Sequence, residues 1–262
     1  MRTEFYEKLR GLLLTGESPT LESSLKPGHL GEERLSWSGG TLGALPEGRT
    51  FCQTLSAPAR LVICGGGHVA RCLAPAARAV GFQVTVLENR PEVLAEGTFG
   101  ADIDCRCGDF VESLQGGAFG PNAFFAIMTR GHQDDWVCLK TALALPHGYV
   151  GMMGSRSKVA ATRKMLAEKG FDAEAIDSVH SPIGLKIGAE TPAEIAVSIV
   201  AELIRCRHIL GLEAPLTPAV IDALGKMPYA MVTLVNCEGS TPRSEGARML
   251  VFPDGSIAGT IG

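Results

Sequence analysis

The chain has 262 residues, of which 45% are hydrophobic and 20% charged, so it can bury one large core or two smaller ones. Its formal net charge of −4 argues against nucleic acid or an anionic membrane as a partner. No apolar run reaches the length of a membrane span, and the acidic N-terminal stretch does not fit a cleavable signal. The 8 cysteines lie mostly in apolar runs, which is typical of reduced thiols in a cytoplasmic protein. Cys105 and Cys107 lack the second pair that a zinc site needs.

Residues 1–58 predict a helix followed by an irregular or small β arm. The stretch 3–14 has the apolar spacing of a short amphipathic helix. The remainder of this region is rich in Gly, Ser and Pro, with strand-like fragments at 34–37 and 49–55. We therefore expect a poorly regular N-terminal region that leads into the next domain.

Residues 59–211 alternate between apolar strands and helical segments. We expect strands at 61–64, 83–87, 104–107, 124–129 and 148–153, and a sixth near Val179. The last helix has a full start signal, with Thr191 as N-cap, Pro192 at the first helical position and Glu194 at the third. This alternation predicts an α/β fold with a doubly wound, parallel, Rossmann-like sheet, in the order 3-2-1-4-5 with helices on both faces.

The turn after the first strand has the pattern of a dinucleotide-binding fingerprint. The sequence GGGHVA at 65–70 fits G-x-G-x-x-A, in which Gly65 permits a tight turn and Gly67 lets a pyrophosphate approach the backbone. The following helix offers free N–H groups to the same anion. Glu88 ends the second strand, where a carboxylate can accept hydrogen bonds from a ribose. The alternative is a plain strand-to-helix crossover with an empty turn.

The loop after the fourth strand contains Arg130 and His132, followed by Asp134 and Asp135. In a doubly wound fold this loop lies where ligands bind, so these side chains could form acid–base machinery or an anion clamp. Alternatively, one of the two aspartates caps the next helix and His132 is a solvated loop residue.

Cationic side chains also follow the fifth strand. Arg156 and Lys158 fall in the first turn of a predicted helix, where they oppose the helix dipole unless an anion binds. This stretch is either an anion site with Ser155 or a solvated basic turn. His180 either faces the same cleft or has a structural role. The candidate cofactor-binding residues are Gly65, Gly66, Gly67, His68, Glu88, Arg130, His132, Ser155, Arg156 and Lys158.

Residues 212–262 differ in composition from the predicted sheet. A linker helix should start at Thr217, and strands are expected at 230–235, 249–252 and 256–261. The loop GSTPRSEGAR at 239–248 carries two arginines and could bind an oxyanion or simply turn the chain.

The motifs together resemble the xanthine dehydrogenase accessory factor family, XdhC/CoxI. The resemblance covers 59–262 and rests on GGGHVA, TRGHQDD, GMMGSRSK, HSPIGLKIGAETPAEIAVSIVAE and the tail GSTPRSEGARMLVFPDGSIAGTIG. Lys186 stands where the family pattern has an acid. The tail resembles a domain that usually precedes the nucleotide fold, so the domain order is expected to be reversed and the small domain truncated.

The resemblance implies a carrier rather than a turnover enzyme. Such proteins bind the molybdenum cofactor (molybdopterin), assist its sulfuration and deliver it to a xanthine dehydrogenase-type hydroxylase. It further implies a cysteine desulfurase as a second partner, a homodimer and a cytoplasmic location. One alternative is an NAD-dependent oxidoreductase that uses the same fingerprint with His132 as acid–base residue, and another is a nucleotide-sensing module.

Overall fold

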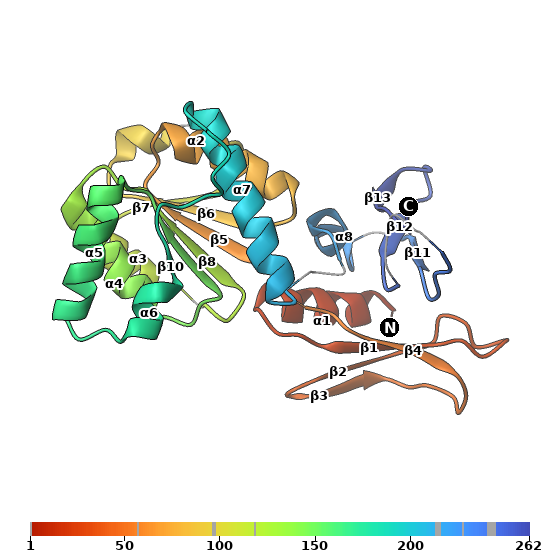
Figure 1. Ribbon diagram of the computed structural model, residues 1–262. Helices are drawn as coiled ribbons and strands as arrows, with labels where there is room; N and C mark the ends of the chain where they lie inside the picture. Colours follow the sequence, from red (N-terminus) through yellow and green to blue (C-terminus); the bar gives the residue numbers. More distant parts are fainter. Residues whose placement is uncertain are drawn as a thin grey trace. The chain divides into compact units, whose positions relative to one another are not determined.

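The computed structural model of the protein describes residues 2–56, 58–95, 98–117, 119–212, 216–226, 228–239 and 245–262 (Figure 1). Contacts divide the chain into two compact units. We call Ala59–Leu212 the Rossmann unit, and Met1–Pro58 together with Glu213–Gly262 the terminal unit. The two ends of the chain, which the sequence analysis treats as separate regions, therefore belong to one unit.

The Rossmann unit contains a six-stranded sheet in which all neighbouring strands are parallel, in the order β10-β9-β8-β5-β6-β7. Counted within the unit, this is the predicted order 3-2-1-4-5 followed by the sixth strand. All five residues of β8 are buried, as expected for a central strand covered on both faces. The strands are β5 (Arg60–Cys64), β6 (Gln83–Glu88), β7 (Asp104–Cys107), β8 (Ala123–Ile127), β9 (Tyr149–Met152) and β10 (Val179–His180).

Helices cover both faces of this sheet (Figure 1). One apolar layer joins the sheet to α2 and α7, and the other joins it to α3, α4 and α5. The helical elements are α2 (His68–Ala79), the 3-10 helix η1 (Pro91–Leu94), α3 (Phe110–Gln115), α4 (His132–Leu143), α5 (Arg156–Glu168), α6 (Ala173–Ser178) and α7 (Pro192–Ile209). The α/β Rossmann-like class expected from the sequence is confirmed.

Helix α7 begins as predicted. The Thr191 hydroxyl accepts a hydrogen bond from the Glu194 N–H at 3.3 Å, and the Glu194 carboxylate accepts one from the Thr191 N–H at 2.9 Å. At the other end of the helix, the Arg207 guanidinium donates to the Val80 carbonyl at 2.9 Å and lies 4.7 Å from the centre of the Phe82 ring. These contacts fix α7 against the end of α2.

The terminal unit combines the N-terminal helix with two antiparallel sheets. One sheet has the order β3-β2-β1-β4, and the other has the order β11-β12-β13. Leucines from α1 and from the first sheet share one buried cluster with α8 and Leu250 of β12. The elements are α1 (Arg2–Leu14), β1 (Thr20–Ser24), β2 (Glu33–Trp37), β3 (Gly40–Gly43), β4 (Thr50–Thr54), α8 (Pro218–Ala223), β11 (Ala230–Thr233), β12 (Arg248–Val251) and β13 (Ile257–Gly259).

The N-terminal region is therefore more regular than the sequence predicts. Gly40, at φ +148°, lies at the turn between β2 and β3, and the antiparallel register pairs it with Trp37. Glycine at this position thus serves a tight hairpin turn within regular structure. Within the described residues, no helix is both long enough and apolar enough to cross a membrane.

Candidate functional site

The candidate site lies at the carboxyl edge of the Rossmann sheet, where β5 and β8 are neighbours. The helix that follows β5 packs on one face of the sheet, and the helix that follows β8 packs on the other. Such a reversal leaves a crevice at the strand ends, which is where ligands bind in doubly wound folds. Both helices begin after glycine N-caps, Gly67 for α2 and Gly131 for α4, and neither cap makes a side-chain hydrogen bond to the helix.

The glycine turn is built around Gly65 and Gly66. Gly65 has φ +108°, and a Cβ there would lie 2.5 Å from the Met128 carbonyl oxygen, so only glycine fits. The Gly65 N–H donates to the Leu87 carbonyl at 2.8 Å, and the Gly66 N–H donates to the Glu88 carboxylate at 2.8 Å. The turn is thus bound directly to the end of β6.

Gly67 and His68 form the outer side of this turn. Both are exposed, and no atom lies within 4 Å of the position that a Cβ on Gly67 would occupy. The first turn of α2 contains no acidic residue. The uncapped N–H groups of α2 therefore open onto free space, an arrangement that suits a phosphate group.

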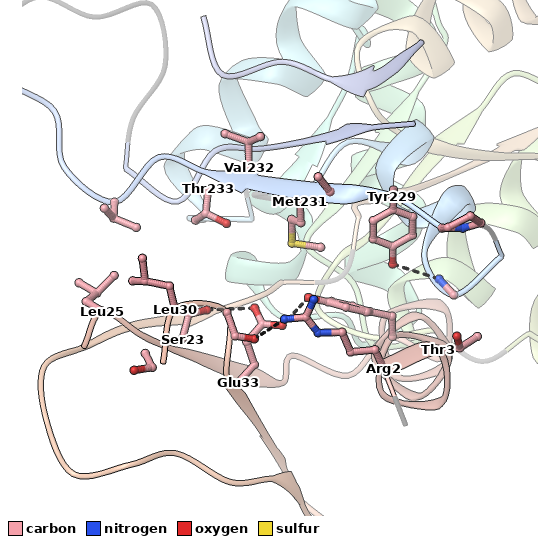
Figure 2. A pocket seen from close by; sticks show the side chains of 17 residues that line it. Arg2, Thr3, Ser23, Leu25, Leu30, Glu33, Tyr229, Met231, Val232 and Thr233 are labelled. Carbon is pink, nitrogen blue, oxygen red and sulfur yellow. Dashed lines mark hydrogen bonds between the residues drawn. The ribbon is translucent and has the colours of Figure 1, made fainter. Parts of the chain in front are cut away.

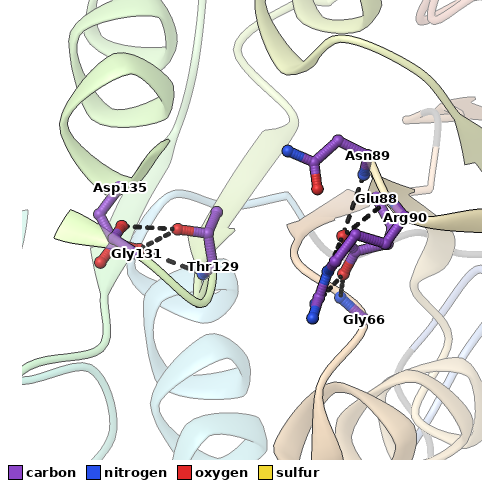
Figure 3. A network of polar contacts seen from close by, with 7 residues as sticks. All are labelled: Gly66, Glu88, Asn89, Arg90, Thr129, Gly131 and Asp135. Carbon is purple, nitrogen blue, oxygen red and sulfur yellow. Dashed lines mark hydrogen bonds and ion pairs between the residues drawn. The ribbon is translucent and has the colours of Figure 1, made fainter. Parts of the chain in front are cut away.

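Glu88 has a different role from the one that the sequence suggests. Its side chain is only 1% exposed, and both carboxylate oxygens accept hydrogen bonds from within the protein (Figure 3). The Arg90 guanidinium binds it at 2.9 Å and 2.8 Å, and the N–H groups of Asn89 and Arg90 approach it at 3.0 Å and 3.2 Å. Binding of a ribose by Glu88 stays a prediction, and it would require Arg90 to move aside.

These contacts also set the ionisation of Glu88. Burial alone raises the pKa of this carboxyl group, but the hydrogen bonds from Arg90 and Gly66 outweigh burial and hold the pKa below its usual value. Glu88 is therefore a carboxylate at neutral pH, and the Arg90 cation compensates its charge.

The loop after β8 is organised by Asp135, whose side chain is buried (Figure 3). This carboxylate accepts hydrogen bonds from the Thr129 N–H at 3.1 Å and the Thr129 hydroxyl at 2.7 Å, and it forms an ion pair with Lys158. The expectation that an aspartate caps α4 is wrong, because the helix begins one residue after Gly131 and both aspartates lie in its first turn. Arg130 is exposed, and the side chain of His132 lies outside the described part of the structure.

Helix α5 is capped by Ser155. The Ser155 hydroxyl accepts a hydrogen bond from the Lys158 N–H at 3.4 Å and lies 2.9 Å from the Ser157 hydroxyl. The Lys158 ammonium is bound by Asp135, so this cation does not need an anion from solution to offset the helix dipole. The structure thus weakens the reason for an anion site here, and the Arg156 side chain lies outside the described residues.

A buried polar cluster between the sheet and α7 includes residues that the sequence analysis missed. The Glu202 carboxylate of α7 accepts hydrogen bonds from the Tyr149 hydroxyl at 2.6 Å and the Gly184 N–H at 2.8 Å, and the His180 Nδ1 lies 3.1 Å from it. Glu202 is 5% exposed. A signal was available in the sequence: Glu202 is an acid within an apolar stretch of helix, on the face that packs against the core.

A separate concavity lies within the terminal unit. It is a cavity of about 710 Å³, with walls formed by α1, the β1–β2 region and β11 (Figure 2). The hydroxyls of Tyr6 and Ser23 donate to the Glu33 carboxylate at its wall, and burial with the nearby Glu33 charge raises the pKa of Tyr6. The described residues that line it include none of the predicted site residues, so this cavity does not belong to the candidate site.

Metal binding finds no support in the described part of the chain, where no group of three or more His, Cys, Asp or Glu residues could hold an ion. Cys105 and Cys107 are exposed free thiols on β7. At the sheet edge, the exposed backbone at the start of α2 has the geometry that suits an anion.

Two family models match this chain. The model described as the XdhC Rossmann domain matches residues 61–203, which is more than half of the chain, and the model described as the XdhC and CoxI family matches residues 225–262. This protein belongs to the XdhC family. The Rossmann match precedes the other along the chain, in the order that the sequence analysis expects.

Individual relatives agree with this assignment. The uncharacterized protein YqeB of Escherichia coli (strain K12) is 35% identical over 153 residues, which are 57% of this chain and 27% of YqeB. A probable xanthine dehydrogenase subunit of Bacillus subtilis (strain 168) is 33% identical over 158 residues, which are 60% of this chain and 46% of the Bacillus subtilis protein. This XdhC-family chain thus matches less than half the length of either relative.

A solved structure shares the fold. The crystal structure of a xanthine dehydrogenase from Bacillus halodurans superposes with a TM-score of 0.66 and 26% sequence identity. The superposition covers 79% of this chain and 64% of that one.

Substitution by alanine should affect stability very differently at two glycines of the same turn. Gly65→Ala places a Cβ against the Met128 carbonyl at positive φ, so it should lower the free energy of unfolding by more than about 2 kcal/mol. Gly67→Ala meets no atom within 4 Å at φ −67°, so it should change that free energy by less than about 0.5 kcal/mol. Urea denaturation followed by circular dichroism measures both, and equal losses would contradict the observed turn.

The pH dependence of the free energy of unfolding should show that Glu88 is charged in the folded protein, when wild type is compared with Glu88→Gln. Loss of its charged hydrogen bonds should cost about 1.5–3 kcal/mol at pH 7. Because the folded-state pKa is lowered, the stabilisation is complete above the ordinary value of 4.5 and is lost as pH falls through the folded-state value. The difference in unfolding free energy between wild type and variant should thus be constant from pH 6 to 8 and shrink below about pH 4.5. A difference that grows on acidification would show that Glu88 is protonated in the folded protein.

Proposed function

We propose that this protein is an accessory factor that binds the molybdenum cofactor and assists its sulfuration and its insertion into a xanthine dehydrogenase-type molybdenum hydroxylase. Membership of the XdhC family supports an accessory role. Two of the similar proteins carry xanthine dehydrogenase in their names, the Bacillus subtilis relative and the Bacillus halodurans crystal structure. The proposed partners are such a hydroxylase and a cysteine desulfurase, and the proposed state is a cytoplasmic homodimer.

The observation that carries the proposal is the exposed start of α2, which has no side-chain cap, at the carboxyl edge where β5 and β8 are neighbours. Molybdopterin bears a phosphate, and its nucleotide forms bear a pyrophosphate. The exposed backbone of Gly67 and His68 leaves space for such a group, and the N–H groups of the first helical turn would hold it. When bound, the cofactor supplies the molybdenum centre, and this chain supplies the anion site that orients it.

The oxidoreductase alternative has less support. A nicotinamide dinucleotide normally uses the acid at the end of the second strand to hold its ribose. Here that acid is Glu88, which is already engaged by Arg90 and by three backbone N–H groups. A ligand that binds mainly through phosphate does not need this carboxylate to be free.

Replacing Gly67 with aspartate should weaken the binding of molybdopterin without destabilising the fold. Asp is a better N-cap than Gly, so Gly67→Asp should leave the thermal midpoint unchanged or slightly raised. Its carboxylate would occupy the phosphate position, so affinity for molybdopterin should fall at least tenfold, which is about 1.4 kcal/mol. The control is Thr217→Asp, which places an aspartate at the N-cap of α8 in the terminal unit and should bind within about twofold of wild type.

The measurements are the pterin and molybdenum content of the purified protein, titration with molybdopterin, and activation of an apo-hydroxylase. Wild type should bind the pterin, activate the hydroxylase and show no sustained turnover alone. Co-purification of a nicotinamide dinucleotide with multiple-turnover hydride transfer would replace this proposal with the oxidoreductase alternative. Undiminished binding by Gly67→Asp would show that the glycine turn is not the phosphate site.

A further inference from the structure

The cluster around Glu202 contains a histidine whose tautomer is fixed by its surroundings. Burial alone raises the pKa of Glu202, but hydrogen bonds from His180, Tyr149 and the Gly184 N–H outweigh burial and hold the pKa below its usual value. Glu202 is therefore an ionised acceptor at neutral pH. Burial and the adjacent Glu202 charge also raise the pKa of the Tyr149 phenol, so Tyr149 stays protonated and donates.

An ionised carboxylate can only accept, so the His180 nitrogen that faces it must carry the hydrogen. That nitrogen is Nδ1, at 3.1 Å from Glu202 Oε1. The neutral imidazole then has its lone pair on Nε2. The His180 side chain is 32% exposed, and no described residue forms a hydrogen bond with Nε2. A carboxylate that fixes a histidine in this way is the usual arrangement of an oriented proton acceptor.

The fold holds this pair by more than one contact. The imidazole ring lies with its centre 4.5 Å from that of Tyr149, at an angle of 36°. Gly151, the β9 neighbour of His180, has no room for a side chain, because a Cβ would lie 2.5 Å from the Tyr149 hydroxyl. After His180, the Ile183 N–H donates to the Met152 carbonyl at 3.0 Å. These contacts thus hold His180, the last residue of β10, against Glu202 of α7.

We propose that His180 and Glu202 form a proton-accepting dyad that acts on a small molecule bound at the carboxyl edge of the Rossmann sheet. The molecule is one that carries a weakly acidic N–H, O–H or S–H group. Its bond to hydrogen breaks and the electron pair stays on the molecule. The Nε2 lone pair takes the proton, and the Glu202 carboxylate offsets the charge of the resulting imidazolium. Glu202 is a positioning residue, and assignment of the molecule as molybdopterin rests on the proposed function.

A histidine with a purely structural role would need only the Nδ1 contact with Glu202. Substitution of His180 by asparagine or by glutamine can therefore separate a structural role from a role as proton acceptor. His180→Asn keeps a donor near the position of Nδ1 and deletes Nε2, whereas His180→Gln keeps a polar group near Nε2 and loses the contact with Glu202. His180→Asn should retain the wild-type thermal midpoint, and His180→Gln should lower it. The control is His29→Asn, because His29 also places Nδ1 2.9 Å from a glutamate, but in an exposed pair with side chains 41% and 49% accessible.

Two measurements test the dyad without any cofactor. Nitrogen-15 spectra of the full chain should show His180 as the Nδ1–H tautomer when neutral, and Glu202→Gln should weaken this preference. Diethyl pyrocarbonate, which acylates accessible unprotonated imidazole nitrogen, should label His180 as well as His29 in a mass-spectrometric assay. An Nε2–H tautomer, or failure to label His180 while His29 reacts, would overturn the proposal.

The role toward a ligand is tested with molybdopterin as the probe. His180→Asn should bind it within about twofold of wild type but activate the apo-hydroxylase on the order of 100-fold less, the scale of a lost acid–base group. If His180→Asn and wild type activate the apo-hydroxylase equally, His180 and Glu202 do not act as a proton acceptor toward the ligand. The proposed function would then still stand. Absence of molybdopterin binding by the wild type would instead refute the proposed function, and the tautomer and labelling results would then decide the dyad.

Discussion

The buried Glu88 carboxylate determines the shape of the glycine turn. It accepts the Gly66 N–H from the turn and the Arg90 guanidinium from the segment after β6, so two loops of the sheet edge meet on one charge. Removing either donor would leave a buried anion less well paired, which is costly in a folded protein. Because the inner side of the turn is fixed in this way, its outer side at Gly67 is free to present backbone N–H groups.

Two other buried carboxylates of the Rossmann unit are paired in a similar way. Glu88, Asp135 and Glu202 are each at most 5% exposed, and each has a cationic or proton-donating side chain as a partner. The partners are Arg90, Lys158 and His180. Lys158 joins α5 to Asp135 of α4, and His180 joins β10 to Glu202 of α7, whereas Arg90 lies two residues after Glu88. These carboxylates therefore hold segments of the Rossmann unit together and are not free acids.

The sequence predicts the sheet order and the start of α7 because periodicity and capping are local properties, legible in segments such as FFAIMT at 124–129 and in Thr191. The sequence predicts the site less well, because the tertiary fold decides which side chain pairs with a given charged residue. Nothing near Lys158 in the sequence shows that Asp135 binds it, and nothing near Glu202 shows Tyr149. The short helices α3 and α6 are also not anticipated, since six residues are too few to show a clear period.

A chain of net charge −4 can still bind an anion at this edge. Long-range charge is screened within about 10 Å at 0.1 M salt, so the local balance decides. Two of the acids nearest the crevice, Glu88 and Asp135, are neutralised by Arg90 and Lys158. What remains unopposed is the positive end of α2, where the described first turn has neither an acid nor a capping side chain. The paired carboxylates thus stabilise the loops while their charge is compensated, so the net negative charge of the chain does not by itself oppose the proposed phosphate site.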